Sequence, residues 1–147
     1  MLPALQELLQ YENPHVLKLY NQNYPNNKLS AEIAFREALK YLWLAKKHEL
    51  DLIENKNNDN FPQQCFMTRS MQEIDQMWHE FILFTEAYTN FCNRYFGEYM
   101  HHLPNLFDTM PMPRDFVDKE VEKLLPYIYD NLGKETLCIW MADYLEE

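Results

Sequence analysis

The sequence predicts an all-α fold, a single-domain irregular bundle of about five to six helices. Only two of the 147 residues are glycine, whereas 47% are hydrophobic and 15% are aromatic. So few glycines disfavour turn-rich β-sandwiches and nucleotide-binding folds with glycine-rich loops. Apolar residues recur at helical spacing, and cap residues precede several of these runs. Because a chain of this length can bury a continuous core, we expect one domain over residues 1–147.

Three helices are expected in the N-terminal third of the chain. The first covers residues 2–11, where leucines recur at helical spacing. Asn13, followed by a proline, suits the N-cap of a second helix over residues 14–20. Ser30 can cap a third, longer helix that runs to about residue 53 and has an apolar face.

The next helix is expected to run from Met71 to Gly97. Ser70 and Glu73 have the S-x-x-E spacing of a capping box, in which both side chains bond to amides that the first turn leaves unpaired. Gly97 is a typical residue at a helix end. Aromatic side chains form one stripe of this helix, and Cys92 falls within it. We therefore expect Cys92 to be a buried, unreactive thiol.

The C-terminal part should contain a loop and two further helices. Residues 103–114 include three prolines and are expected to form an ordered crossing loop. Asp115 can cap the following helix, which Pro126 can kink and which ends near Gly133. A last helix is expected over residues 135–145.

Composition excludes several partners. The formal charge is −10, and no basic run is longer than the pair Lys46-Lys47, so neither nucleic acid nor an anionic membrane is an expected partner. The sequence has no basic leader and no apolar stretch long enough to span a bilayer. Cys65, Cys92 and Cys138 are odd in number and lack C-x-x-C spacing. These features predict a reducing compartment and a cytoplasmic protein.

Asp75 and His79 are the first half of a candidate functional site. They are four residues apart, which places a carboxylate and an imidazole on neighbouring surface of one helix. His101 and His102 could complete a mixed set of ligands for a divalent metal, zinc or iron. The alternative is structural: Asp75 would favour the helix dipole, His79 would form a hydrogen bond at the border of the core, and the histidine pair would cap the helix end.

Distance decides whether the two halves can meet. A straight helix would separate His79 from Gly97, 18 residues further on, by roughly 27 Å. The helix must therefore break early, near Thr85, or a second subunit must contribute. Three other polar residues are expected at or near the surface: Glu80, Glu86 and His48.

The residues from Ile74 to Pro104 read I-D-x-x-W-H-x-F-I-L-F-T-x-x-Y-x-x-F-C-x-x-x-F-G-x-Y-x-H-H-x-P. This pattern resembles the signature of the glycine-rich domain-containing protein-like family. The motif positions carried here are Asp75, Trp78, His79, Tyr88, Cys92, Gly97, His101 and His102. The resemblance implies a helical domain of undefined biochemical activity.

The sequence therefore predicts a helical protein with a candidate divalent-metal or polar site, formed by an Asp-x-x-Trp-His helix and a His-His-x-Pro turn. A metal bound there would either organise the fold or activate water. The alternative is a non-catalytic acidic protein that recognises another protein through exposed aromatic side chains. Neither a substrate nor a catalytic residue follows from the sequence.

Overall fold

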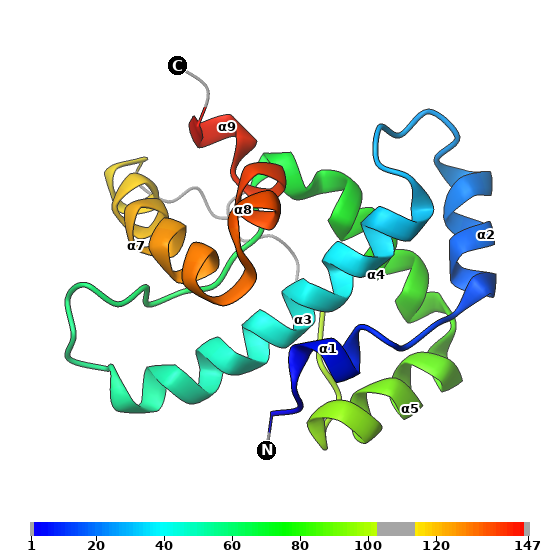
Figure 1. Cartoon of the computed structure of the whole chain (residues 1–147), viewed down its shortest axis with the longest axis horizontal. Coiled ribbons are helices and arrows are strands. Elements are labelled where there is room, and N and C mark those ends of the chain that lie inside the picture. The colour runs from blue at the N-terminus through cyan, green and yellow to red at the C-terminus, as the bar shows by residue number, and fades with distance from the viewer. Residues whose placement is uncertain (1, 103–113, 146–147) are drawn as a thin grey trace. The chain divides into compact units, whose positions relative to one another are not determined.

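A computed structural model describes residues 2–102 and 114–145, and all regular secondary structure within these ranges is helical, as Figure 1 shows. The predicted all-α class is confirmed. In the same ranges, no helix is both long enough and apolar enough to cross a membrane. The α-helices are α1 (Leu5–Leu8), α2 (Pro14–Asn23), α3 (Ala31–Glu54), α4 (Gln72–Leu83), α5 (Thr85–Phe96), α7 (Arg114–Leu132), α8 (Lys134–Trp140) and α9 (Ala142–Leu145).

The chain divides into two compact units. Unit 1 comprises Met1–Lys46 and Gln72–His102, and unit 2 comprises Lys47–Met71 and Leu103–Glu147. The single domain expected over residues 1–147 stays a prediction. Both halves of the candidate site belong to unit 1.

Aromatic rings form the core of unit 1. Tyr11, between α1 and α2, has its ring centroid 4.8 Å from that of Phe91 and 5.8 Å from that of Phe81. Phe81 in turn lies 5.3 Å from Phe35 of α3. Aromatic pairs at such separations stabilise a fold beyond the burial of their area. This aromatic cluster therefore packs α3, α4 and α5 against the segment between α1 and α2.

The predicted single helix over residues 71–97 is wrong, because the chain forms two helices, α4 and α5, that meet at Phe84. Phe84 has φ −85° and ψ 71°, outside the helical region. Figure 1 shows the change of direction between the two ribbons. A straight helix would place residues 78 and 88 about 15 Å apart, whereas Trp78 Nε1 donates a hydrogen bond to Tyr88 Oη over 2.9 Å. The break is what permits this contact.

The start of α4 also differs from the prediction. A 3₁₀ turn, Arg69–Met71, precedes the helix, and the expected capping box does not form. Ser70 instead bonds with Asp143, whose backbone N–H donates to Ser70 Oγ over 2.9 Å. Glu73 accepts hydrogen bonds from two backbone amides of the loop before α3, at 2.8 and 3.1 Å. Ser70 and Glu73 thus form hydrogen bonds with residues far away in the sequence, and a local sequence motif cannot indicate such partners.

Unit 2 is organised around two buried polar residues. Glu120 of α7 accepts hydrogen bonds from the amides of Gln63 and Gln64, at 2.8 and 3.1 Å. His48 was expected at or near the surface, but it is only 5% exposed and its Nε2 lies 2.7 Å from the carbonyl oxygen of Pro62. The expectation failed because the chain that follows α3 returns and covers this histidine.

Local cap signals predicted three other helix ends but not the start of α7, because Asp115, the expected cap, lies within that helix. Val16 donates its N–H to Asn13 Oδ1 over 3.3 Å, and Ile33 donates to Ser30 Oγ over 3.2 Å, so both predicted N-caps are confirmed. Gly97 ends α5 in the left-handed conformation, with φ 74°.

Four predicted elements have different bounds. The second helix, expected over residues 14–20, runs on to Asn23 as α2. The first helix, expected over residues 2–11, is the short α1. The last, expected over residues 135–145, is interrupted at Met141, which lies between α8 and α9 with φ −118°. α7 begins at Arg114 and continues through Pro126. The crossing loop expected to begin at residue 103 lies outside the described residues up to residue 113.

Candidate functional site

Asp75 and His102 form the centre of the site. Asp75 lies in the first turn of α4, and His102 lies five residues beyond Gly97, where the chain has left α5. His102 Nε2 is 2.6 Å from Asp75 Oδ1, a short hydrogen bond between residues 27 positions apart. The His102 side chain is 21% exposed and that of Asp75 is 45% exposed. The contact therefore lies at the surface of unit 1, with the imidazole more protected than the carboxylate.

His79 stands beside this pair. It follows Asp75 by one helical turn, and its ring centroid is 6.3 Å from that of His102, with the ring planes at 82°. His79 is exposed, so its side chain is not fixed by packing. The structure thus brings together two imidazoles and a carboxylate from α4 and from the segment after α5, and the helix break near Thr85 makes this possible.

His101 is not part of the group. Its ring centroid lies 4.8 Å from that of Tyr99, and it is exposed. It also faces the carboxylate of Glu98, which forms an ion pair with Lys46 of α3. Three of the four predicted site residues are therefore close to one another, whereas His101 has other neighbours.

A buried chain of hydrogen bonds positions His102. Trp78 donates to Tyr88 Oη, and the Tyr88 hydroxyl donates to the carbonyl oxygen of Met100, two residues before the histidine. The Trp78 ring also packs against that of His102, with centroids 4.2 Å apart. Burial raises the pKa of Tyr88, so its hydroxyl stays protonated and can donate. α4 and α5 together therefore hold the backbone and the ring of the segment that carries His102.

Cys92 contributes packing to the same region. It is fully buried, as predicted, and burial raises the pKa of its thiol. A thiol of raised pKa is a poor nucleophile at neutral pH. The prediction of an unreactive cysteine agrees with this environment.

The Asp75 carboxylate favours the charged form of His102. The hydrogen bond between them raises the pKa of His102, burial opposes this, and Coulombic attraction to Asp75 and a bond with the backbone of His102 add to the increase. The site therefore consists of a hydrogen-bonded imidazole–carboxylate pair, in which the charged form of His102 is favoured, next to a second, exposed imidazole.

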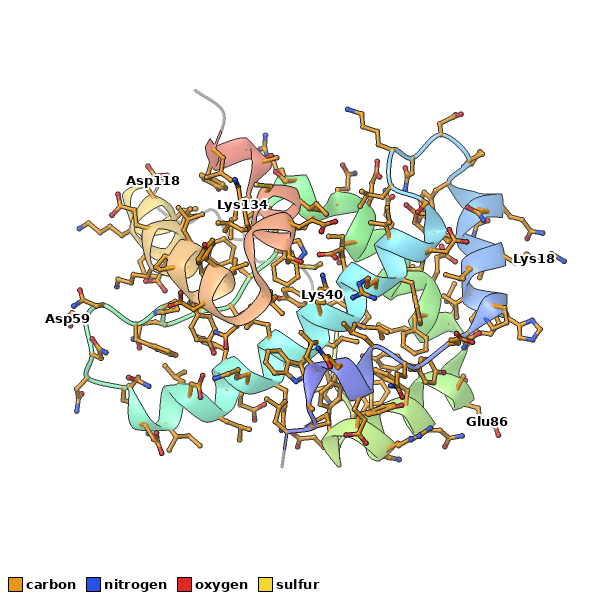
Figure 2. All side chains as sticks on the ribbon, viewed as in Figure 1. Lys18, Lys40, Asp59, Glu86, Asp118 and Lys134 are labelled. Atoms are coloured by element: carbon orange, nitrogen blue, oxygen red, sulfur yellow. The ribbon has the colours of Figure 1, made fainter. Side chains whose placement is uncertain are left out.

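Another flank of α4 is polar but not solvated. Glu80 was expected at the surface, yet it is only 3% exposed and accepts a hydrogen bond from the Asn23 side chain over 3.1 Å. Gln76 accepts a bond from Asn27 over 2.8 Å. The last residue of α2 and the Asn-rich loop that follows it thus supply the partners of these two side chains, which no helical projection could indicate. By contrast, Glu86 of α5 is exposed as predicted and points away from the ribbon in Figure 2.

Tyr24 is a neighbour of the site that the sequence did not indicate. Burial raises the pKa of its hydroxyl, and so do a hydrogen bond with Glu80 and the nearby charges of Glu80 and Asp75. A tyrosine in an asparagine-rich loop has no spacing relationship to α4 that would have placed it here.

As the side chains stand, no three His, Cys, Asp or Glu residues in the described part of the chain are arranged around one possible metal position. Asp75 and His102 are hydrogen-bonded directly to each other, which leaves no space for an ion between them. The His79 ring is too far from this pair to share an ion without moving. A metal could therefore bind here only with a change of the His79 rotamer and release of the proton between Asp75 and His102.

Comparison with known proteins gives one match. Residues 59–115 match the model of a family described as UCP032817-like, which is uncharacterised. The matched range is less than half of the chain and contains all four predicted site residues. A search of curated proteins and a search of solved structures found no match.

This match corrects the resemblance drawn from the motif between Ile74 and Pro104. Nothing indicates the glycine-rich domain-containing protein-like family, and the matching family is a different one. The resemblance relied on the spacing of aromatic and histidine residues, and the aromatic part of that spacing also follows from the packing of α4 against α5.

Proposed function

We propose that Asp75, His79 and His102 bind one divalent metal ion, zinc or iron(II). The observation that carries the proposal is the direct contact between His102 and Asp75 with a second imidazole next to it. Two histidines and one carboxylate are a donor set that suits both ions, and three protein ligands leave positions for water.

The required rearrangement is small. Imidazole rings that share a tetrahedral zinc ion have centroids about 5 Å apart, given a Zn–N bond of about 2 Å. The observed distance between the ring centroids of His79 and His102 is 6.3 Å, which is longer than this value. A rotation of the His79 side chain to another rotamer can shorten it by the difference. His79 is exposed and free to make this rotation, whereas His102 is already held against Trp78.

The positions of the three ligands favour a structural role for the metal, which would hold parts of unit 1 together. The three residues come from α4 and from the segment after α5, and a shared ion would link the two as the Asp75–His102 hydrogen bond now does. An ion that binds only the folded state stabilises it by about 2.7 kcal/mol at a concentration 100-fold above its Kd. The three side chains do not line the cavities of about 560 and 420 Å³ in the described residues, and an organising role needs no substrate pocket.

The test is a calorimetric zinc titration of protein purified without a histidine tag. Loss of a residue that only orients a metal ligand weakens metal binding roughly 10- to 100-fold. The variants His79→Ala, His102→Ala and Asp75→Asn each remove a ligand, so each should raise the Kd for zinc by more than that. His101→Ala is the matched control and should bind as the wild type does. A parallel anaerobic titration with iron(II) identifies the preferred ion.

Two results would contradict the proposal. One is a loss of binding in His101→Ala as large as that in His102→Ala, which would mean that the metal does not distinguish the two histidines as proposed. The other is weak binding that is unchanged in every variant.

A further inference from the structure

Unit 1 has an open groove, separate from the metal-site residues, between the start of α2 and the first turns of α3. Its volume is about 420 Å³, within the range of about 300–1,000 Å³ that is usual for binding sites. Six apolar or aromatic residues form its floor and walls: Leu9, Tyr11, Leu17, Ile33, Phe35 and Leu39.

The walls of the groove expose apolar surface to solvent. Ile33 of α3 is 46% exposed, and Leu9 and Leu17 on the opposite side are half-buried. A single exposed isoleucine is ordinary, but partly exposed aliphatic side chains on both sides of a hollow are typical of a binding surface.

Charged residues border the apolar floor. Glu12 and Glu32 lie on the rim with one basic residue, Arg36, and all three are exposed. In the described ranges neither glutamate takes part in an ion pair. The rim is therefore acidic overall, on a chain whose formal charge is −10. Such a border favours a ligand with basic groups beside its apolar part.

The surrounding structure favours a helical ligand. Helices and the turns between them form the walls, so in the described part of unit 1 there is no strand edge to which an extended peptide could add. An amphipathic helix satisfies its own backbone hydrogen bonds and can place several aliphatic side chains in an open groove.

We propose that this groove binds an amphipathic helix of a partner protein, with leucine-like side chains on the floor and lysine or arginine residues facing Glu12 and Glu32. Recognition of another protein is the second function that the composition permits. It does not depend on the metal site, because none of the groove residues belongs to that site.

The proposal can be tested with a fluorescent 14-residue peptide of leucine and lysine, with leucines at helical spacing, by anisotropy at physiological salt. Ile33→Gln should raise the Kd about tenfold, because it puts a polar group into the apolar wall. The double variant Glu12→Gln/Glu32→Gln should raise the Kd severalfold and reduce its dependence on salt.

Matched controls separate the groove from the general acidity of the chain. Ile53→Gln changes another isoleucine of α3, 67% exposed and outside the groove, and Glu86→Gln changes an exposed glutamate of α5. Both should bind the peptide as the wild type does, and so should His102→Ala. Circular dichroism checks that every variant is folded.

Several results would overturn the proposal: no binding of the peptide by the wild type, equal binding by a leucine–glutamate peptide, or equal weakening by Ile33→Gln and Ile53→Gln. Tight binding of a fatty acid such as oleate, with loss of peptide binding, would assign the groove to a small apolar ligand instead. Dimerisation that Ile33→Gln abolishes would assign it to a second copy of the chain.

Discussion

Trp78 donates its indole N–H to the Tyr88 hydroxyl across the break between α4 and α5, and Tyr88 passes a hydrogen bond on to the carbonyl oxygen of Met100. Both aromatic residues are buried. This relay connects the two helices with the segment that leads to His102. The position of the candidate site therefore depends on a contact in the core of unit 1.

Replacement of Tyr88 by phenylalanine should be costly. It leaves the Trp78 N–H without its acceptor and the Met100 carbonyl without its donor, and unpaired buried polar groups cost about 1–3 kcal/mol each. We expect Tyr88→Phe to lower the free energy of unfolding, measured in urea, by at least about 1–3 kcal/mol. Tyr99→Phe, at a residue that is 37% exposed, is the control and should change little. Equal effects of the two substitutions would show that the relay is not important for stability.

The Asp75–His102 contact predicts a dependence of stability on pH. The folded-state pKa of His102 is raised, so its stabilising contribution is complete below the unfolded pKa of about 6.5 and is lost as the pH rises through the folded value. In the presence of a chelator, the wild type should exceed Asp75→Asn in unfolding free energy more at pH 6 than at pH 9. His101→Asn should leave the profile unchanged. A constant difference between wild type and Asp75→Asn would refute the assignment.

Glu73 should stabilise the loop before α3. Its carboxylate accepts the backbone N–H groups of Lys28 and Leu29, and hydrogen bonds to a charged group contribute about 1.5–3 kcal/mol when protected from water. Because one of these bonds is exposed, we expect Glu73→Ala to cost about 1–2 kcal/mol in chemical denaturation. Glu86→Ala, on the exposed surface of α5, is the control. The account of this loop fails if both variants are as stable as the wild type.

Gly97 should resist substitution for a conformational reason alone. Its φ is 74°, and a Cβ at this position would meet no atom within 4 Å. Gly97→Ala should therefore cost about 1–2 kcal/mol from the left-handed backbone, without a steric clash. Asn tolerates the left-handed conformation better than Ala does. The midpoint of thermal unfolding of Gly97→Asn should therefore lie between those of the wild type and Gly97→Ala. A cost for Asn larger than that for Ala would point to a different cause.

Sequence reasoning succeeded at three helix ends where the signal is local. Asn13, Ser30 and Gly97 occupy the cap positions that their chemistry predicts, because a cap bonds to amides or carbonyls within one turn. It failed at Phe84, where neither glycine nor proline marks the break. Contacts between α4 and α5 maintain that break, and they are visible only in the folded chain.

The same limit applies to the site. The spacing of Asp75 and His79 indicated that both share one side of α4, and the distance argument required either a break near Thr85 or a second subunit, of which the structure has the break. It could not distinguish His102 from His101, since adjacent residues outside a helix are oriented by their tertiary contacts. The burial of Glu80 was missed because its partner, Asn23, lies at the end of α2, far away in the sequence.

The most direct test of the central claim is a long-range ¹H–¹⁵N NMR spectrum of the imidazole nitrogens, recorded with and without one equivalent of zinc. We predict that the nitrogen resonances of His79 and His102 shift on addition of zinc, while those of His101 and of the exposed His15 stay in place. A shift of His101 in place of His102, or no shift of either His79 or His102, would contradict the claim that α4 and the segment after α5 share a metal ion.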